Sequence, residues 1–230
     1  MTRTRIKICG LTRAQDVQAG VAAGVDALGF VFYPASPRAV DARAAAALVQ
    51  LLPPFVSAVG LFVNATPEQL RAVTNSVPLA LLQFHGDESA EQCAELAALA
   101  GRPFMRACRV KSDTSGADLL EYERQYRCAS SLFSGLLLDT HVESYGGAGK
   151  VFDWSVIPKE LAPRVVLSGG LSVANATEAV LRVRPYGVDI SSGVELQKGI
   201  KDARQIAAFV ARVRAADATI QRETDHDQPS

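Results

Sequence analysis

Short apolar segments recur along the whole chain and alternate with longer segments in which apolar positions follow helical spacing. The short segments are rich in Val, Ile, Leu and Phe, as expected for strands that are buried on both faces of a parallel sheet. The expected strands are residues 5–10, 27–32, 57–63, 79–84, 104–110, 135–140, 165–169 and 187–191.

Capping residues mark where the intervening helices begin and end. A Ser, Thr, Asp or Asn side chain before a helix accepts a hydrogen bond from its first turn, and a Gly often follows the last turn. The predicted N-caps are Thr12, Asp41, Thr66 and Asp87, and the predicted stops are Gly24 and Gly101. A final amphipathic helix is predicted over residues 202–216.

Eight strands that alternate with helices predict an α/β protein, a single-domain (β/α)8 TIM barrel, over residues 1–214. The runner-up is a doubly wound open sheet, which normally has fewer strands and often a nucleotide fingerprint. The sequence contains no GxGxxG after the first strand and no GxxxxGK[ST]. Because the chain turns polar near its end, a disordered tail is expected over residues 215–230.

The composition limits the classes of binding partner that the protein can be expected to have. The 230 residues are 48% hydrophobic, and 24 Lys and Arg balance 24 Asp and Glu. A net charge of zero gives no attraction to nucleic acid or to an anionic membrane, so an anionic ligand must be held by local groups. No long apolar segment follows the amino terminus, and therefore neither a signal peptide nor a membrane span is expected.

The four cysteines, Cys9, Cys93, Cys108 and Cys128, have wide and irregular spacing. They form no CxxC pair, and so predict neither a zinc site nor a disulfide framework. Reduced thiols in a cytoplasmic protein fit this pattern best.

Two candidate catalytic residues end predicted strands. Cys9 ends the first strand and Asp139 the sixth, and barrel enzymes carry their active sites at these strand ends. A buried, inert thiol is the alternative for Cys9, because free Cys is among the most buried residue types. A helix cap is a weak alternative for Asp139, because no clear helix begins at Thr140.

Small residues follow three consecutive strands and predict a phosphate site, where backbone N–H groups can approach an anion. The alternative is that they are only flexible turns. The candidates are Gly147 and Gly149 after the sixth strand, Ser168, Gly169 and Gly170 after the seventh, and Ser191, Ser192 and Gly193 after the eighth.

Three further polar residues lie at strand ends. Arg38 can bind a carboxylate bidentately, although an exposed structural Arg fits equally well. His85 is more often structural than catalytic at such a position, and Asp189 can orient the phosphate loop. Their spacing predicts no metal site, and the set predicts a cofactor-free acid–base enzyme acting on a phosphorylated, carboxylate-bearing small molecule.

The ordered motifs resemble the phosphoribosylanthranilate isomerase family from about residue 6 to residue 214. Each motif is weak alone, and the ordered set is specific. The runs are Lys7-Ile8-Cys9-Gly10-Leu11-Thr12, Ser36-Pro37-Arg38, Gln83-Phe84-His85-Gly86, Leu138-Asp139, Gly146-Gly147-Ala148-Gly149-Lys150-Val151-Phe152-Asp153-Trp154, Leu167-Ser168-Gly169-Gly170-Leu171 and Asp189-Ile190-Ser191-Ser192-Gly193-Val194-Glu195.

The resemblance implies a TIM barrel that performs an Amadori rearrangement in tryptophan biosynthesis, as a monomer or a homodimer. It converts N-(5-phosphoribosyl)anthranilate to 1-(2-carboxyphenylamino)-1-deoxyribulose 5-phosphate. By resemblance, Cys9 is the general base, Asp139 the general acid and Arg38 the ligand of the anthranilate carboxylate, while Gly170 and Gly193 belong to the phosphate loops.

The chain departs from the family pattern twice. Ala148 stands where Thr is usual, and Gln197-Lys198-Gly199 stands where Pro-Gly is common. Neither departure involves the acid or the base, and both concern loop stiffness.

Two classes of alternative function remain: another phosphate-binding barrel enzyme and a non-catalytic binding barrel. A histidine-pathway phosphosugar isomerase would carry Asp where this chain has Cys9, and indole-3-glycerol-phosphate synthase needs a catalytic Lys on an early strand. A non-catalytic phosphate-ligand-binding barrel would need neither Cys9 nor Asp139.

Overall fold

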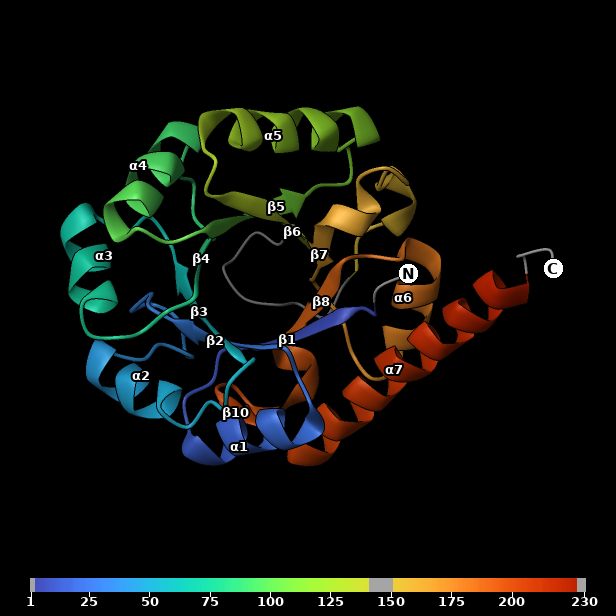
Figure 1. The fold of residues 1–230 in the computed structure, drawn as a ribbon, viewed down its shortest axis with the longest axis horizontal. Helices are drawn as coiled ribbons and strands as arrows, with labels where there is room; N and C mark the ends of the chain where they lie inside the picture. Colours follow the sequence, from blue (N-terminus) through green and yellow to red (C-terminus); the bar gives the residue numbers. More distant parts are fainter. Residues whose placement is uncertain (1–2, 141–150, 227–230) are drawn as a thin grey trace.

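In the computed structural model, which describes residues 3–140 and 151–226, eight parallel strands close into a barrel (Figure 1). Each strand pairs with the next, and β8 pairs with β1, which confirms the predicted fold class. The strands are β1 (Arg5–Cys9), β2 (Ala27–Val31), β3 (Ser57–Phe62), β4 (Leu81–Phe84), β5 (Phe104–Val110), β6 (Phe133–Thr140), β7 (Val165–Leu167) and β8 (Gly187–Ile190).

The helices surround the barrel as an outer ring (Figure 1). They are α1 (Ala14–Ala23), α2 (Ala42–Val49), α3 (Pro67–Thr74), α4 (Ala90–Ala100), α5 (Gly116–Ala129), α6 (Ala176–Val183) and α7 (Ala203–His226). Three short 3-10 helices are η1 (Trp154–Val156), η2 (Ala162–Arg164) and η3 (Ser192–Val194), and a small hairpin joins β9 (Glu195–Gln197) to β10 (Ile200–Lys201).

Strand alternation decides which side chains reach the barrel interior. In β1, Ile6 and Ile8 pack into the main hydrophobic core with the helices, whereas Lys7 and Cys9 point inside the barrel. Successive side chains of a strand point to opposite faces, so a residue that ends a strand on the interior side faces the barrel mouth.

Two of the predicted N-caps are wrong. Thr12 donates its hydroxyl to the carbonyl oxygen of Gly199 at 2.5 Å instead of capping α1, which starts at Ala14. Ser89, not Asp87, caps α4, because Ser89 and Gln92 have the spacing of a reciprocal capping box. The predicted caps Asp41 and Thr66 and the stops Gly24 and Gly101 are confirmed.

The prediction of a disordered tail from residue 215 is wrong for residues 215–226, because α7 continues to His226. Ala216 and Ile220, one helical turn apart, are buried, and the Asp217 carboxylate accepts hydrogen bonds from the Thr4 N–H and hydroxyl. A polar segment needs only one buried stripe to be a stable helix, and composition does not reveal that stripe. Residues 227–230 lie outside the described residues.

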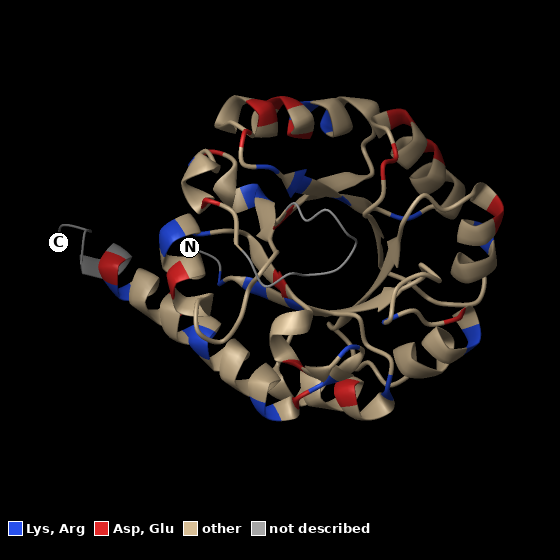
Figure 2. Cartoon of the chain, turned by 180° about the vertical axis from the view of Figure 1, so that it is seen from behind, with Lys and Arg blue, Asp and Glu red and all other residues tan. Residues whose placement is uncertain are grey.

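Acidic and basic side chains are interspersed over the outer helices, in line with the zero net charge (Figure 2). In the part of the chain that the structure describes, no helix combines the length and apolar character that crossing a membrane requires.

Candidate functional site

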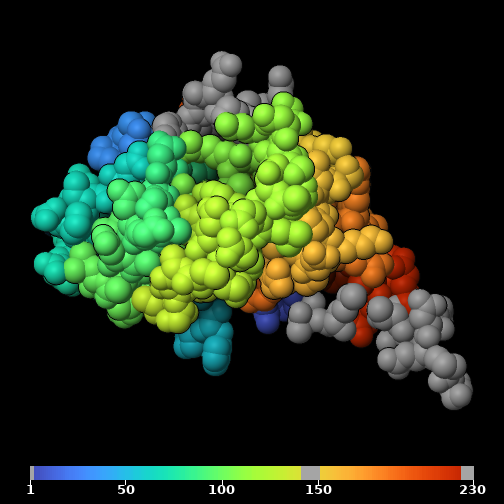
Figure 3. Space-filling view, turned by 90° about the horizontal axis from the view of Figure 1, so that it is seen from above, coloured from blue at the N-terminus to red at the C-terminus, as the bar shows by residue number. Residues whose placement is uncertain are grey.

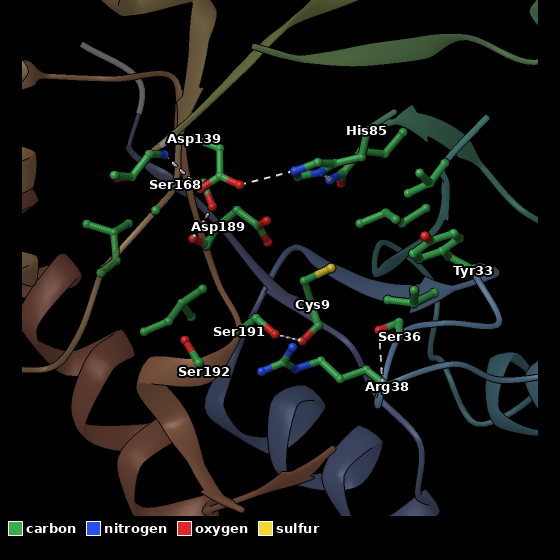
Figure 4. A pocket seen from close by; sticks show the side chains of 18 of the residues that line it. Cys9, Tyr33, Ser36, Arg38, His85, Asp139, Ser168, Asp189, Ser191 and Ser192 are labelled. Carbon is green, nitrogen blue, oxygen red and sulfur yellow. Dashed lines mark hydrogen bonds and ion pairs between the residues drawn. The ribbon is translucent and has the colours of Figure 1, made fainter. Parts of the chain in front are cut away.

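A pocket opens at the carboxyl ends of the barrel strands, and most of the predicted site residues line it (Figure 4). Residues from β1, β4, β6, β7 and β8 and from the loops that follow them meet there, although they are up to about 180 positions apart in the chain. The predicted residues among its lining are Cys9, Arg38, His85, Asp139, Ser168, Gly169, Gly170, Asp189, Ser191 and Ser192.

Cys9 lies at the floor of this pocket. Its sulfur is directed toward the wall that carries Asp139 and His85 (Figure 4), and the residue is only 5% exposed. Burial raises the pKa of the Cys9 thiol, and the nearby ammonium of Lys7 acts in the opposite direction. Cys9 therefore borders the pocket, and its burial favours the neutral form of the thiol.

An ion pair lies directly below the thiol, inside the barrel. Lys7 Nζ donates to Asp189 Oδ1 at 2.8 Å, and each side chain is 6% exposed. Burial works to lower the pKa of Lys7, but the charges of Asp189 and of a Cys9 thiolate outweigh it and raise the pKa. The ammonium thus stays charged at physiological pH.

Asp139 is hydrogen-bonded at both carboxylate oxygens. Oδ1 accepts from the Thr140 N–H at 2.9 Å, and Oδ2 lies 3.1 Å from His85 Nε2. Gln83 Nε2 lies 2.9 Å from His85 Nδ1, and an amide nitrogen can only donate. His85 Nδ1 therefore accepts, and Nε2–H donates to Asp139.

Arg38 is held by a bidentate ion pair. Its Nε and one Nη each donate to a Glu195 carboxylate oxygen at 2.8 Å, and Lys201 Nζ donates to the same carboxylate at 2.8 Å. Burial would raise the pKa of Glu195, but the hydrogen bonds from Arg38 and Lys201 lower it overall. Glu195 and Lys201 belong to the β9–β10 hairpin, so this hairpin fixes the guanidinium at the pocket edge.

Glycine is required at the ends of β7 and β8 because neighbouring chain segments pass too close to leave room for a side chain. Gly169 and Gly170 have φ of +77° and +68°, and a Cβ on Gly169 would collide with Thr140. A Cβ on Gly193 would collide with the Leu171 carbonyl. Only residues without a side chain let these loops pass so near to one another.

The hydroxyl groups at the same strand ends support the loops. Ser168 Oγ donates to the Asp189 carbonyl at 3.2 Å, and Ser191 Oγ donates to the Cys9 carbonyl at 2.9 Å. Gly193, predicted to bind substrate, is not among the pocket-lining residues and shapes the loop behind them. Gly147 and Gly149 lie outside the described residues.

The sequence interpretation missed Lys7, Gln83, Glu195 and Lys201 as parts of this site. A charged residue between two isoleucines of a buried strand was an available signal for Lys7. Glu195 follows the predicted phosphate loop and binds Arg38 across 157 positions, for which no local pattern exists. Lys201 joins this pair through Glu195. Within residues 3–140 and 151–226, no cluster of three or more His, Cys, Asp or Glu could hold a metal ion.

Comparison with known proteins identifies the family of this chain. Residues 6–212 match the family model of N-(5'-phosphoribosyl)anthranilate isomerase. The chain belongs to this family. A member from Herminiimonas arsenicoxydans is 67% identical over 219 residues, which cover 95% of this chain and 96% of the relative.

Two solved structures of this phosphoribosylanthranilate isomerase family bear on the site and on assembly. One, a complex with reduced 1-(o-carboxyphenylamino)-1-deoxyribulose 5-phosphate, is 36% identical with a TM-score of 0.77, covering 92% of this chain and 99% of that one. The other consists of mutually generated monomers of the dimeric Thermotoga maritima isomerase. It is 37% identical with a TM-score of 0.77, at coverages of 92% and 99%.

The departures from the family pattern fall in two places. Lys198-Gly199 forms the turn of the β9–β10 hairpin, where Gly199 has φ of +81° and its carbonyl accepts from Thr12. Ala148 lies outside the described residues.

Proposed function

We propose that Cys9 and Asp139 carry out an acid–base Amadori rearrangement in this pocket. As a member of its family, the chain is an isomerase of tryptophan biosynthesis that interconverts an aldose and a ketose. Its substrate is N-(5'-phosphoribosyl)anthranilate, and its product is 1-(2-carboxyphenylamino)-1-deoxyribulose 5-phosphate. The observation that carries the proposal is the presence of the Cys9 thiol and the Asp139 carboxyl group in the same pocket, on β1 and β6.

Asp139 begins the reaction as the acid. Its protonated form transfers a proton to the furanose ring oxygen, and cleavage of the C1–O bond leaves an iminium at C1. The carboxylate that remains is stabilised by the Thr140 N–H and the His85 Nε2–H, the two donors described above.

Cys9 completes the reaction as the base. The iminium acidifies the proton on sugar C2, and the Cys9 thiolate removes it to form an enolamine and a neutral thiol. The Asp139 carboxylate accepts the hydroxyl proton of the enolamine and the Cys9 thiol donates its proton to C1, which yields the ketone and restores the acid and the thiolate. Protons lost and gained balance over the cycle, as an isomerisation requires.

The two anionic ends of the substrate have separate binding groups. The loops at Ser168, Gly169 and Gly170 and at Ser191 and Ser192 bring backbone amides to the pocket for the phosphate. Arg38 offers the anthranilate carboxylate the Nη amino group that Glu195 leaves available. The phosphorylated ligand of the solved family complex supports this arrangement.

Replacing Arg38 by methionine is expected to raise KM for N-(5'-phosphoribosyl)anthranilate about tenfold or more, with a smaller effect on kcat. A hydrogen bond to a charged group contributes roughly 1.5–3 kcal/mol, which corresponds to this range. Steady-state kinetics measure both parameters. The matched control is Arg43→Met on the exposed face of α2, which should leave KM unchanged. An unchanged KM in Arg38→Met would contradict the assignment.

The activity itself is tested by following the fluorescence of the anthranilate substrate, which decays as the isomer forms. Decay with purified chain supports the proposal. Saturable binding without decay would favour the non-catalytic phosphate-binding barrel. The aminoaldose of the histidine pathway serves as the second substrate, since a bifunctional or histidine-pathway isomerase would turn it over.

The reaction site also points to a compartment. All four cysteines are free, and a thiol base must stay reduced to accept a proton. A reducing cytoplasm meets this requirement and is the compartment that we propose.

We also propose that the protein forms a homodimer through the amino-terminal end of the barrel. Phe55, between α2 and β3, is fully exposed with φ of +72°, and the segment around it projects from the molecule as a teal knob (Figure 3). A hollow of about 450 Å³ opens beside it, lined by Ala27, Leu81, Val166 and other residues near the strand starts. A second copy can insert its Phe55 there, and a dimeric family member supports the proposal.

The change Phe55→Asp is expected to convert the dimer to monomers, because it replaces the aromatic ring that would pack against the apolar part of the hollow with a short charged group. Sedimentation equilibrium measures the mass. Activity at saturating substrate should persist, since the site lies at the opposite end of the barrel. A wild-type chain that sediments as a monomer at micromolar concentration would contradict the proposal.

A further inference from the structure

The surroundings of Cys9 disfavour the thiolate, which is the form that can act as a base. Cys9 is 5% exposed, with Val31 and Leu61 packed against it, and burial disfavours a thiolate. A buried anion needs a nearby cation or donor. The positive groups that act on Cys9 are therefore the residues to examine.

Lys7 is the first positively charged group to consider near the Cys9 sulfur. Two residues before Cys9 on β1, it points to the same interior side, and its positive charge lowers the pKa of the thiol. The Cys9 sulfur and the Lys7 ammonium both approach Gly29 on the paired strand β2. A Cβ built on Gly29 would lie 2.9 Å from Cys9 Sγ and 3.1 Å from Lys7 Nζ.

Space for both groups therefore depends on the missing side chain. The 2.9 Å separation is shorter than real Cβ contacts, so an alanine at this position would push the sulfur or the ammonium away. Gly29 lies within a regular strand, where glycine is normally unfavourable, which gives its presence here a structural reason.

Other charges also face the thiol, from several elements. Asp189 on β8 raises its pKa but holds Lys7 by the 2.8 Å ion pair, and Lys201 on β10 lowers it. The Arg38 guanidinium, beyond β2, also interacts with a Cys9 thiolate, but it is bound to Glu195, as is Lys201. Asp139 and His85 line the same pocket. Lys201 and Arg38 are both bound to Glu195, whereas Lys7 Nζ and Cys9 Sγ both lie within 3.1 Å of the place that a Cβ on Gly29 would take.

We propose that Lys7, held in place by Asp189, is the positioning residue that stabilises the thiolate of Cys9, and that Gly29 provides the space in which the two groups meet. This inference rests on the proposed role of Cys9 as the base. Lys7 does not take the substrate proton. It makes the proton acceptor available, and the proton from sugar C2 goes to sulfur.

The test compares two variants that differ only in the Lys7 charge: Asp189→Asn, and Lys7→Met combined with Asp189→Asn. The double variant leaves no buried carboxylate unpaired, which would endanger folding. The rate of Cys9 alkylation by iodoacetamide is measured against pH, with mass spectrometry to separate Cys9 from the exposed Cys128. The midpoint for the double variant should lie at least about one pH unit above that for Asp189→Asn. Equal midpoints would overturn the proposal.

Two further variants keep the proposal testable if the double variant fails to fold. Gly29→Ala retains every charge but separates sulfur from ammonium, and should also raise the alkylation midpoint. Lys201→Met is the matched control, a buried lysine bound to Glu195 and Ser191, and should shift the midpoint less than loss of Lys7. A midpoint for Gly29→Ala at the wild-type value would count against the proposal.

The pH profile of kcat/KM connects the thiol to turnover. A base that must be deprotonated gives a rate that rises with pH through its pKa, so the rise should move to higher pH in the double variant relative to Asp189→Asn. At pH 7.5 this corresponds to a loss of about tenfold or more. Alkylation reports the Lys7 coupling without substrate. If the alkylation midpoint moves but Cys9→Ala retains full activity, the coupling stands and the proposed base role fails.

Discussion

Replacing Cys9 by alanine is expected to lower kcat by at least about a hundredfold, because general acid–base catalysis contributes roughly 10²–10⁴. Alanine removes the proton acceptor from the pocket floor, and the C2 proton of the iminium has no other acceptor proposed for it. The loss should appear in kcat, while KM changes little, since the carboxylate and phosphate groups are bound elsewhere. Stopped-flow or steady-state fluorescence of the anthranilate substrate measures both.

A second cysteine variant controls for the removal of a thiol. Cys128→Ala changes an exposed residue at the end of α5, far from the pocket lining, and should turn over like the unmodified chain. Near-normal turnover by Cys9→Ala would sink the assignment of the base. Circular dichroism of both variants separates a catalytic loss from a folding defect.

Replacing Asp139 by asparagine is expected to cause a loss of similar size, at least about a hundredfold in kcat. The asparagine oxygen can still accept from the His85 Nε2–H, while the Thr140 N–H loses its carboxylate partner and the transferable proton is lost. Ring opening then has no acid, and the unreacted, ring-closed substrate should accumulate on the protein. Single-turnover kinetics with excess protein detect that accumulation.

The matched control is Asp113→Asn, an exposed carboxylate in the loop that follows β5 at the same end of the barrel. It should leave kcat within about twofold of the unmodified value, as surface substitutions usually do. If Asp139→Asn turns over at a rate comparable to Asp113→Asn, Asp139 is not the acid.

The fold and the positions of the two candidate catalytic residues were predictable because both depend on local patterns. Apolar runs of strand length alternate with capped helices, and Cys9 and Asp139 end two of those runs. The rule that barrel active sites lie at the carboxyl ends of the strands then brings residues that are distant in sequence to one pocket. The roles of acid and base remain proposals.

The contacts that tune the site were not predictable in this way. The Lys7–Asp189 pair joins residues 182 positions apart, and the Arg38–Glu195 pair joins residues 157 apart. Which partner a buried charge finds depends on strand register and on side-chain rotamers, and a single sequence shows neither. The partner of Thr12 was also not predictable: its hydroxyl donates to the Gly199 carbonyl and does not cap the helix that follows.

The end of the chain was misjudged for a related reason. Polarity argues for disorder only when no apolar stripe finds a surface to cover, and Ala216 and Ile220 do find one. That surface is formed by other parts of the molecule, and so the outcome depends on the tertiary structure.

The long helix α7 therefore attaches the carboxyl-terminal part of the chain to the segment that precedes β1. Asp217 binds the Thr4 N–H and hydroxyl, and Arg214 donates to the Thr4 carbonyl at 2.7 Å, immediately before the strand that ends in Cys9. A shortened chain that stops at residue 214 would lose Asp217 and the rest of this helix, and with them part of the anchorage of β1. An affinity tag or fusion partner should for this reason be joined beyond residue 226.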